Sequence, residues 1–140
     1  PGVSKALASP GLRGVIICPS NPYLSIDPIL SIPGFRCSLS EITVPVIAVS
    51  PIIGGKAIKG PTEKIMNEMN LKAGCSSLSV AHHYRDILDG FIIDTLDAGQ
   101  SDDIAALGIE VSVGETLMTS LQIKKDLAQH CLALIEKIQS

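Results

Sequence analysis

The chain is poor in the features of a nucleic-acid-binding or membrane protein. It has no tryptophan, two tyrosines and two phenylalanines in 140 residues, and its net charge is −3. Nucleic-acid-binding surfaces carry basic stripes interleaved with aromatic residues, so we expect no nucleic-acid partner. No apolar run approaches the roughly 18 residues that span a bilayer, and no signal peptide opens the sequence. We therefore expect no membrane partner and a cytoplasmic location.

Closely spaced cysteine pairs are also missing. Cys18, Cys37, Cys75 and Cys131 lie far apart and form no CxxC motif. In a reducing cytosol this spacing predicts free thiols in the core, with a disulfide pair as the open alternative. Hydrophobic residues make up 46% of the chain and its mean hydropathy is positive, so a chain of this length can bury the core of about one domain.

Short apolar, β-branched runs alternate with segments of helical periodicity. We expect strands at residues 14–18, 45–50, 91–94 and 109–113, and a loop at 51–60. The expected helices lie within 28–40 with a break at 33–34, from Pro61 onward with Ile65, Met66 and Met69 on one face, at 79–88, between Ser101 and Gly108, and at 119–138. This alternation predicts an α/β fold of Rossmann-like type, with a mostly parallel sheet flanked by helices and right-handed crossovers.

The last expected helix carries its own apolar stripe. Its predicted buried face comprises Leu121, Leu127, Ala128, Cys131, Leu132, Ile135 and Ile138. No internal repeat, linker or low-complexity tract interrupts the sequence, so we see no domain boundary within it.

The loop after the first expected strand is the first candidate site. Ligands of open α/β sheets bind at the carboxyl ends of the strands. Asn21 lies between Pro19 and Pro22, which stiffen the backbone, and Ser20 and Ser25 add hydroxyl groups. An amide, two hydroxyls and free backbone N–H groups suit an anion or a nucleotide. An ordinary turn between a strand and a helix is the alternative.

The loop after the second expected strand is the second candidate. Gly54 and Gly55 permit close backbone approach, and Lys56 and Lys59 supply positive charge before a helix start. Together they form a plausible phosphate cradle. The loop is not a P-loop, because Ala57 follows Lys56 where that motif has serine or threonine. A glycine loop with two solvated lysines is the alternative.

Other chemically interesting residues give weaker signals. His82 and His83 are adjacent on an expected helix, so they point about 100° apart and share a metal poorly. We interpret them as partly exposed helix residues. Asp94 ends a strand, where it either assists a ligand or caps a turn, and a solvated helix edge explains Asp86 and Asp89. No spacing compels a catalytic triad or a glycosidase carboxylate pair.

Two long motifs give the chain a family resemblance. The first runs from Ile17 through Cys-Pro-Ser-Asn-Pro to the Ile-Pro-Gly-Phe-Arg segment that ends at Arg36, and the second spans residues 49–61. With Tyr84-Arg85-Asp86, the segment 88–91 and Thr-Leu-Met at 116–118, they closely resemble the 2-phospho-L-lactate transferases of deazaflavin coenzyme F-420 biosynthesis. The resemblance covers residues 12–138.

The resemblance implies a reaction. Members of this family bind a guanylylated phospholactate or its phosphoenolpyruvate counterpart, and a ribityl hydroxyl of the deazaflavin precursor Fo attacks the phosphorus. GMP leaves, and Mg²⁺ offsets the developing charge. The family is also expected to form homodimers. Phosphoryl-type transfer depends on positioning and charge stabilisation, so the resemblance implies that Ser20, Asn21, Ser25, Gly54, Gly55, Lys56 and Lys59 bind the donor.

The resemblance also implies that part of the enzyme is missing. Family members are about twice as long, and their N-terminal half carries a glycine-rich turn and the aspartates tied to metal and Fo. The present chain starts at Pro1 without an initial strand, so we expect it to be the C-terminal half of one α/β transferase domain. Catalytic residues and most Mg²⁺ ligands are then expected outside it, and the chain alone is expected to be inactive.

Two questions stay open at this point. The sequence does not discriminate a lactyl from an enolpyruvyl donor. The alternative function is a non-catalytic nucleotide-binding or regulatory protein of the same fold, like the bacterial gluconeogenesis-factor proteins. That group carries a Gly-Pro-Gly-Ser-type loop where this chain has Pro19-Ser20-Asn21-Pro22.

Overall fold

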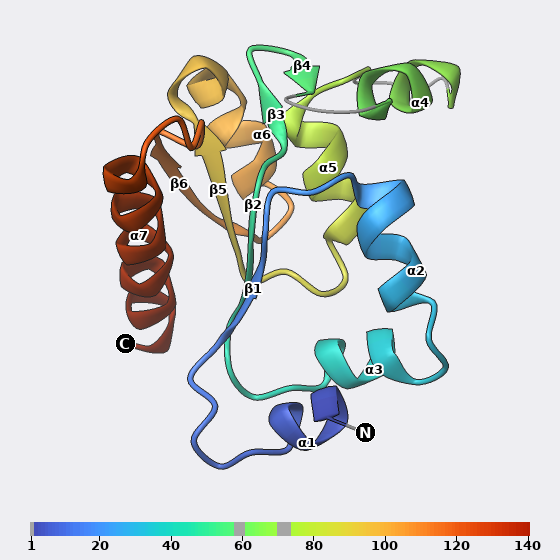
Figure 1. Cartoon of the computed structure of the whole chain (residues 1–140), viewed down its shortest axis with the longest axis vertical. Coiled ribbons are helices and arrows are strands. Elements are labelled where there is room, and N and C mark those ends of the chain that lie inside the picture. Colours follow the sequence, from blue (N-terminus) through green and yellow to red (C-terminus); the bar gives the residue numbers. More distant parts are fainter. Residues whose placement is uncertain (1, 58–60, 70–73) are drawn as a thin grey trace.

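The computed structural model describes residues 2–57, 61–69 and 74–140. Their elements follow the predicted alternation of strands and helices (Figure 1). In chain order they are α1 (Gly2–Leu7), β1 (Val15–Ile17), the π-helix η1 (Pro22–Ile26), α2 (Asp27–Leu30), α3 (Phe35–Ser40), β2 (Val46–Val49), β3 (Ile52–Ile53), β4 (Lys56–Ala57), α4 (Thr62–Glu68), α5 (Ser77–Tyr84), β5 (Gly90–Asp94), the 3-10 helix η2 (Thr95–Gln100), α6 (Ser101–Ala105), β6 (Glu110–Gly114) and α7 (Leu121–Gln139).

Four parallel strands form the main sheet, in the order β1-β2-β5-β6. In register, Ile16 lies opposite Ile47, and Ala48 opposite Phe91. All residues of β2 and β5 are buried, as expected for parallel strands covered on both faces. The predicted α/β fold with a parallel, Rossmann-like sheet is therefore confirmed.

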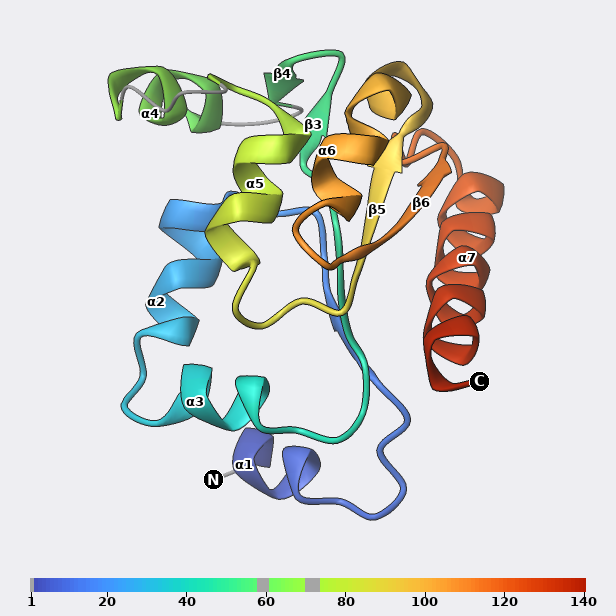
Figure 2. The same cartoon turned by 180° about the vertical axis from the view of Figure 1, so that it is seen from behind.

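Helices cover the two faces of the sheet unequally (Figures 1 and 2). Side chains of α2, α3, α5 and α6 pack on one face, together with Val46, Ala48, Phe91 and Ile93. Among the described residues, the other face packs on α7. The core thus has two layers, one on each side of β2 and β5.

The buried face of α7 differs in part from the predicted stripe. Its fully buried residues are Leu127, Cys131, Leu134 and Ile135. The predicted Leu121, Ala128 and Leu132 are exposed instead. Successive residues of a helix differ by about 100°, and the narrow stripe that packs on Ile47, Val49 and Ile92 leaves the flanks of α7 in solvent.

The segment predicted as a loop at 51–60 contains a β-hairpin. β3 and β4 pair antiparallel, with Ile53 opposite Lys56. Gly54 and Gly55 have φ values of +56° and +75°. Two consecutive positive φ angles are what a two-residue type I′ hairpin turn requires, so the glycines shape a hairpin. The loop prediction was wrong there, and residues 58–60 lie outside the described part.

Three helices begin or pack differently from the predictions. α5 begins at Ser77, where the Ser76 hydroxyl accepts the Ser79 N–H, and it ends at Tyr84, not at residue 88. Met66 of α4 is buried, but Met69, the residue that follows the end of α4, is exposed. The sequence predicts Ser101 as the cap of the helix that follows it, but Ser101 is the first residue of α6, because η2 runs directly into that helix.

The four cysteines are unpaired thiols, as predicted. Cys131 is buried in the core, where burial raises its pKa to about 11, and Cys75 is half-buried and packs against the core. Cys18 and Cys37 are exposed, so the expectation that all four are core thiols was wrong. Within the described ranges, no helix combines the length and apolar character needed to cross a membrane.

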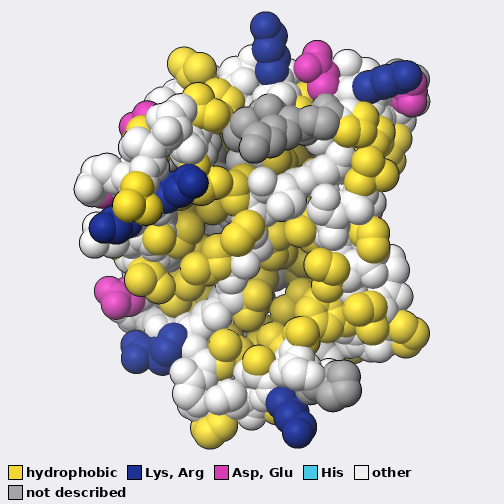
Figure 3. All heavy atoms as spheres, viewed as in Figure 1, with side chains coloured by type: hydrophobic (Ala, Val, Ile, Leu, Met, Phe, Trp, Pro, Cys, Tyr) yellow, Lys and Arg dark blue, Asp and Glu magenta, His cyan; other side chains and the backbone are white. Residues whose placement is uncertain are grey.

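β1 forms one edge of the sheet and has a strand neighbour on one side. Ile16 in this strand is 39% exposed. Figure 3 shows the molecule from this side, and hydrophobic side chains spread over much of the visible surface. An open parallel edge with apolar flanks is a surface that proteins normally cover.

Candidate functional site

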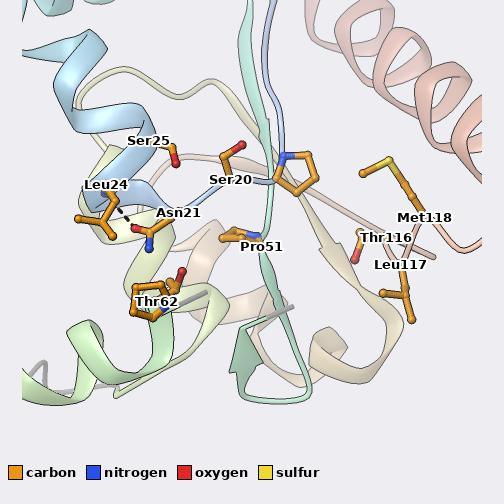
Figure 4. A pocket seen from close by; sticks show the side chains of 11 residues that line it. Ser20, Asn21, Leu24, Ser25, Pro51, Thr62, Thr116, Leu117 and Met118 are labelled. Carbon is orange, nitrogen blue, oxygen red and sulfur yellow. Dashed lines mark hydrogen bonds between the residues drawn. The ribbon is translucent and has the colours of Figure 1, made fainter. Parts of the chain in front are cut away.

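A cavity of about 460 Å³ lies at the carboxyl edge of the sheet. Its walls come from the loops after β1 and β2, the start of α4 and the loop between β6 and α7, as Figure 4 shows. The lining residues are Pro19, Ser20, Asn21, Leu24, Ser25, Pro51, Pro61, Thr62, Thr116, Leu117 and Met118. Ligands of open α/β sheets bind at this edge.

Asn21 has a fixed orientation in this cavity. Its Oδ1 atom accepts hydrogen bonds from the backbone N–H groups of Tyr23 and Leu24, each at 3.0 Å, and thereby caps η1. With the oxygen fixed in this way, the amide nitrogen faces the other direction, on the Thr62 side in Figure 4. This Nδ2 atom is buried and has no partner among the described residues.

A buried amide nitrogen without a partner is costly, because it has lost water and gained no hydrogen bond. Asn21 lines the cavity, and a free amide N–H is able to donate to an oxygen of a ligand. Ser20 and Ser25 line the same cavity. The structure therefore brings together three of the sequence-predicted site residues.

The opposite wall depends on Asp94. Its Oδ2 accepts hydrogen bonds from the N–H of Thr116 at 3.1 Å and from its hydroxyl at 3.0 Å. Its Oδ1 accepts the N–H of Leu96 at 3.0 Å, which caps η2. The turn-capping interpretation of Asp94 is confirmed, and the same carboxylate fixes the segment that carries Leu117 and Met118 into the cavity wall.

Opposing influences act on Asp94 and its neighbour Asp97. Burial raises the pKa of Asp94, but the hydrogen bonds from Leu96 and Thr116 outweigh it and leave the pKa below the ordinary value. For Asp97, burial dominates and raises the pKa, and the charge of Asp94 adds to that effect. The two carboxyl groups therefore differ in acidity at the same edge of the sheet.

The glycine loop lies outside this cavity. Gly54 donates its N–H to Asp97 Oδ2 at 3.0 Å, so this amide is already engaged. Lys56 is exposed in β4 and is not among the cavity-lining residues. Lys59, the other predicted phosphate-binding cation, lies outside the described residues. The described part thus places the two predicted loops at the same edge of the sheet without joining Lys56 to Asn21.

The lining of the cavity is uncharged. Its eleven described residues include no Asp, Glu, His, Lys or Arg. In the described ranges, no three His, Cys, Asp or Glu side chains are placed to hold a metal ion. Mg²⁺ prefers carboxylate and phosphate oxygens, so the described residues do not fit a protein-built Mg²⁺ site.

The histidines behave as two separate residues. His82 is exposed, whereas His83 is half-buried and lies 2.7 Å from Asp27 Oδ1 through its Nε2 atom. Asp86 pairs with Arg36 at 2.7 Å, so its explanation as a merely solvated residue was incomplete. The Arg36 hydrogen bond lowers the pKa of the Asp86 carboxyl, against a smaller effect of burial.

Sequence reasoning missed several cavity residues. Thr62, Thr116, Leu117 and Met118 line the cavity, but none was proposed as a site residue. Thr62 and Thr116 are almost fully buried, which is unusual for threonine. Thr116 follows the end of the expected strand at 109–113. A polar residue at that place was the signal that could have identified it as a site residue.

Comparison with known proteins assigns the chain to a family. The family described as 2-phospho-L-lactate transferase CofD matches residues 1–129. A 2-phospho-L-lactate transferase of Methanosarcina barkeri is 39% identical over 144 aligned positions, covering 98% of this chain and 45% of that protein. The corresponding protein of Methanosarcina mazei is 40% identical over 135 positions, covering 91% and 43%.

A third relative has another name. A phosphoenolpyruvate transferase of Streptomyces griseus is 33% identical over 141 positions, covering the whole of this chain and 43% of that protein. The chain thus spans less than half the length of these relatives. From the extent of the family match and the coverage of the chain by these relatives, we conclude that it belongs to the 2-phospho-L-lactate transferase CofD family.

Proposed function

We propose that this chain forms the donor-binding part of a transferase of coenzyme F-420 biosynthesis. The complete protein moves a 2-phospho-L-lactate or phosphoenolpyruvate group from a guanosine-diphosphate-linked donor to the deazaflavin precursor Fo, and releases GMP. The names of the relatives support the two candidate groups. The observation that carries the proposal is the buried, unpartnered Asn21 Nδ2 atom in the wall of the carboxyl-edge cavity.

In this proposal the described residues bind the donor and orient it. Asn21 donates from Nδ2 to an oxygen of the donor, and Ser20 and Ser25 add hydroxyl groups. Leu117 and Met118 supply the apolar side of the cavity. Neutral donors in a partly dry site hold an acceptor oxygen without reorganising during the reaction, and placing the donor phosphorus against the incoming hydroxyl is most of what phosphoryl transfer needs.

The bond changes are those of a displacement at phosphorus. An Fo hydroxyl oxygen forms a bond to the phosphorus that bears the lactyl or enolpyruvyl group. The bond from that phosphorus to the bridging oxygen of GMP breaks, GMP keeps the electron pair, and the hydroxyl proton is released to water. We place the catalytic groups and the ligands of Mg²⁺ in parts of the protein outside this chain.

Several further assignments belong to the same proposal. Gly54, Gly55, Lys56 and Lys59 contribute to binding the phosphates of the donor. The chain is the C-terminal half of one α/β domain, and the complete protein is a cytoplasmic homodimer. This chain alone is inactive.

The test is turnover and binding by the complete protein that contains this chain. Fo is supplied with guanylylated phospholactate or guanylylated phosphoenolpyruvate, and GMP release and coupled product are measured. Ser25→Leu fills the cavity and should weaken donor binding, whereas Ser40→Leu on the exposed side of α3 is the matched control. No donor binding would refute the proposal, and binding without turnover would favour a non-catalytic nucleotide-binding protein.

A further inference from the structure

One side chain of α5 contacts both flanks of the π-helix that lines the cavity. His83 Nε2 lies 2.7 Å from Asp27 Oδ1, and the His83 and Tyr23 ring centroids are 4.8 Å apart. Tyr23 and Asp27 are four residues apart, and Leu24 and Ser25 between them line the cavity. The His83 imidazole therefore contacts the residues on both sides of Leu24 and Ser25, although it does not line the cavity itself.

His83 is itself held in place. Arg36 of α3 donates from Nη2 to the backbone carbonyl oxygen of His83 at 3.0 Å, while its Nε donates to Asp86 at 2.7 Å. The ring of Tyr84 meets the imidazole edge-on, with centroids 5.1 Å apart. A fixed backbone and a neighbouring ring leave the His83 side chain few alternative orientations, so it is a firm anchor.

η1 is a short element whose position also depends on residues outside it. Its backbone bonds run from the N–H groups of Ser25 and Ile26 to the Asn21 carbonyl oxygen and from the Asp27 N–H to the Pro22 carbonyl oxygen. It is a five-residue π-helix, capped at its start by Asn21 Oδ1. Isolated helices of this length are unstable, and π-helical turns are rare and recur at functional sites. Tyr23 and Ile26 of η1 also pack against the core, and His83 adds one contact at each flank of this short element.

We infer that His83 is a positioning residue for the cavity: through Tyr23 and Asp27 it holds η1 in the form that presents Asn21, Leu24 and Ser25 to the ligand. The inference rests on the proposed function only for the identity of that ligand. The affinity of a site falls by the fraction of the protein that is in the binding-competent form. Loss of His83 therefore weakens binding and leaves the bound complex unchanged.

Three single variants separate this role from general stability. His83→Phe keeps a ring against Tyr23 but removes the hydrogen bond to Asp27. His83→Gln restores a donor at similar reach. His82→Phe, at the exposed neighbouring position, is the matched control for replacing an imidazole of α5 with a phenyl ring.

The first measurement needs no donor. Hydrogen–deuterium exchange is followed in the complete protein for peptides covering residues 20–30. We expect faster exchange in His83→Phe, with wild-type exchange in His83→Gln and His82→Phe. Wild-type exchange in His83→Phe, or equal acceleration in His82→Phe, would overturn the inference.

The second measurement uses the guanylylated donors. We expect the dissociation constant of His83→Phe to rise about fivefold or more, with kcat at saturating donor unchanged and near-complete rescue by Gln. A lower kcat at unchanged affinity would contradict a positioning role. Failure of the wild-type protein to bind either donor would refute the proposed function, while the exchange result would still decide the role of His83.

A variant of Asp27, the hydrogen-bond partner of His83, keeps the inference testable if His83→Phe misfolds. Asp27→Ala removes the same hydrogen bond from the partly exposed side of α2. Asp27→Ala should accelerate hydrogen–deuterium exchange to the same degree as His83→Phe. The double variant of Asp27 and His83 should exchange little faster than either single variant, because the effects of coupled residues are not additive. Fully additive effects would show that the two residues act independently and would overturn the inference.

Discussion

Asp94 and Thr116 are joined by two hydrogen bonds to a single carboxylate oxygen, one from the backbone N–H at 3.1 Å and one from the hydroxyl at 3.0 Å. Thr116 is fully buried. The pair connects the end of the central strand β5 to the loop between β6 and α7. The positions of Leu117 and Met118 in the cavity wall thus depend on one carboxylate.

Thr116→Val should destabilise the complete protein by about 2 kcal/mol, because it removes a hydrogen bond to a charged group while nearly preserving volume. Donor affinity should fall as well, since the wall carrying Leu117 and Met118 loses its anchor. Thr116→Ser keeps the hydroxyl and is the control. Chemical unfolding and calorimetry measure the two effects, and equal behaviour of Val and Ser would contradict the prediction.

Asp94 should make stability fall in acid. Its hydrogen bonds, opposed by burial, leave its pKa below the ordinary value. Its contribution is therefore fully present above the unfolded pKa, near pH 4, and is lost as pH falls through the folded pKa. The free energy of unfolding of wild type and Asp94→Asn should converge below about pH 4. Curves that stay parallel from pH 3 to pH 7 would exclude this role.

Asp97 contributes with the opposite sign. Burial raises its pKa, so its favourable contribution is present below the unfolded pKa and is lost as pH rises through the folded one. Asp94→Asn removes the negative charge that adds to the raised pKa of Asp97, so the contribution of Asp97 is smaller in the variant. A control comparison of Asp97→Asn with the double variant Asp94→Asn/Asp97→Asn isolates the effect of Asp94.

Asn21→Asp and Asn21→Ala should rank in one order for stability and in the opposite order for donor binding. Asp keeps the capping oxygen that accepts from Tyr23 and Leu24, so it should be more stable than Ala by about 1 kcal/mol. Asp also replaces the free Nδ2 donor with a negative oxygen beside an acceptor atom of the ligand. Donor affinity and kcat/KM should therefore be lower for Asp than for Ala. The same order in both measurements would restrict Asn21 to a capping role.

Lys56→Ala should weaken donor binding in the complete protein by about 1 kcal/mol. Charge-assisted bonds contribute more than this when buried, but Lys56 is exposed and solvent screens its charge. Calorimetry at low and high salt measures the effect, which should shrink as salt rises. Identical affinity of wild type and variant at low salt would remove Lys56 from the site.

Gly90→Ala should destabilise the protein by about 1–3 kcal/mol, as overpacking in a filled core does. A Cβ atom there would lie 2.8 Å from Ile138 Cδ1 and 2.9 Å from Ile47 Cγ2. Gly99→Ala is the matched control, because nothing lies within 4 Å of its added methyl group. Thermal unfolding compares the two, and equal melting temperatures would show that the sheet and α7 yield to the extra methyl.

The strands of the main sheet were predictable because each is a short apolar run bounded by turn residues. The β3–β4 hairpin was missed although Gly54-Gly55 between apolar residues is a hairpin signal, because those glycines were interpreted as a phosphate cradle. The Asn21 loop was found from its residue types and its position after a strand. Its π-helical form depends on tertiary contacts such as Tyr23 with His83, which no local pattern encodes.

The order β1-β2-β5-β6 has a consequence for biosynthesis. Within this sheet, every strand after β1 is added beside the strand that precedes it in the sequence. When the ribosome releases β2, its neighbour β1 has already been made. In the same way, β2 is available when β5 emerges, and β5 is available when β6 emerges. No strand must wait for a later one to fill a gap between them, so assembly of these four strands can proceed in the direction of translation.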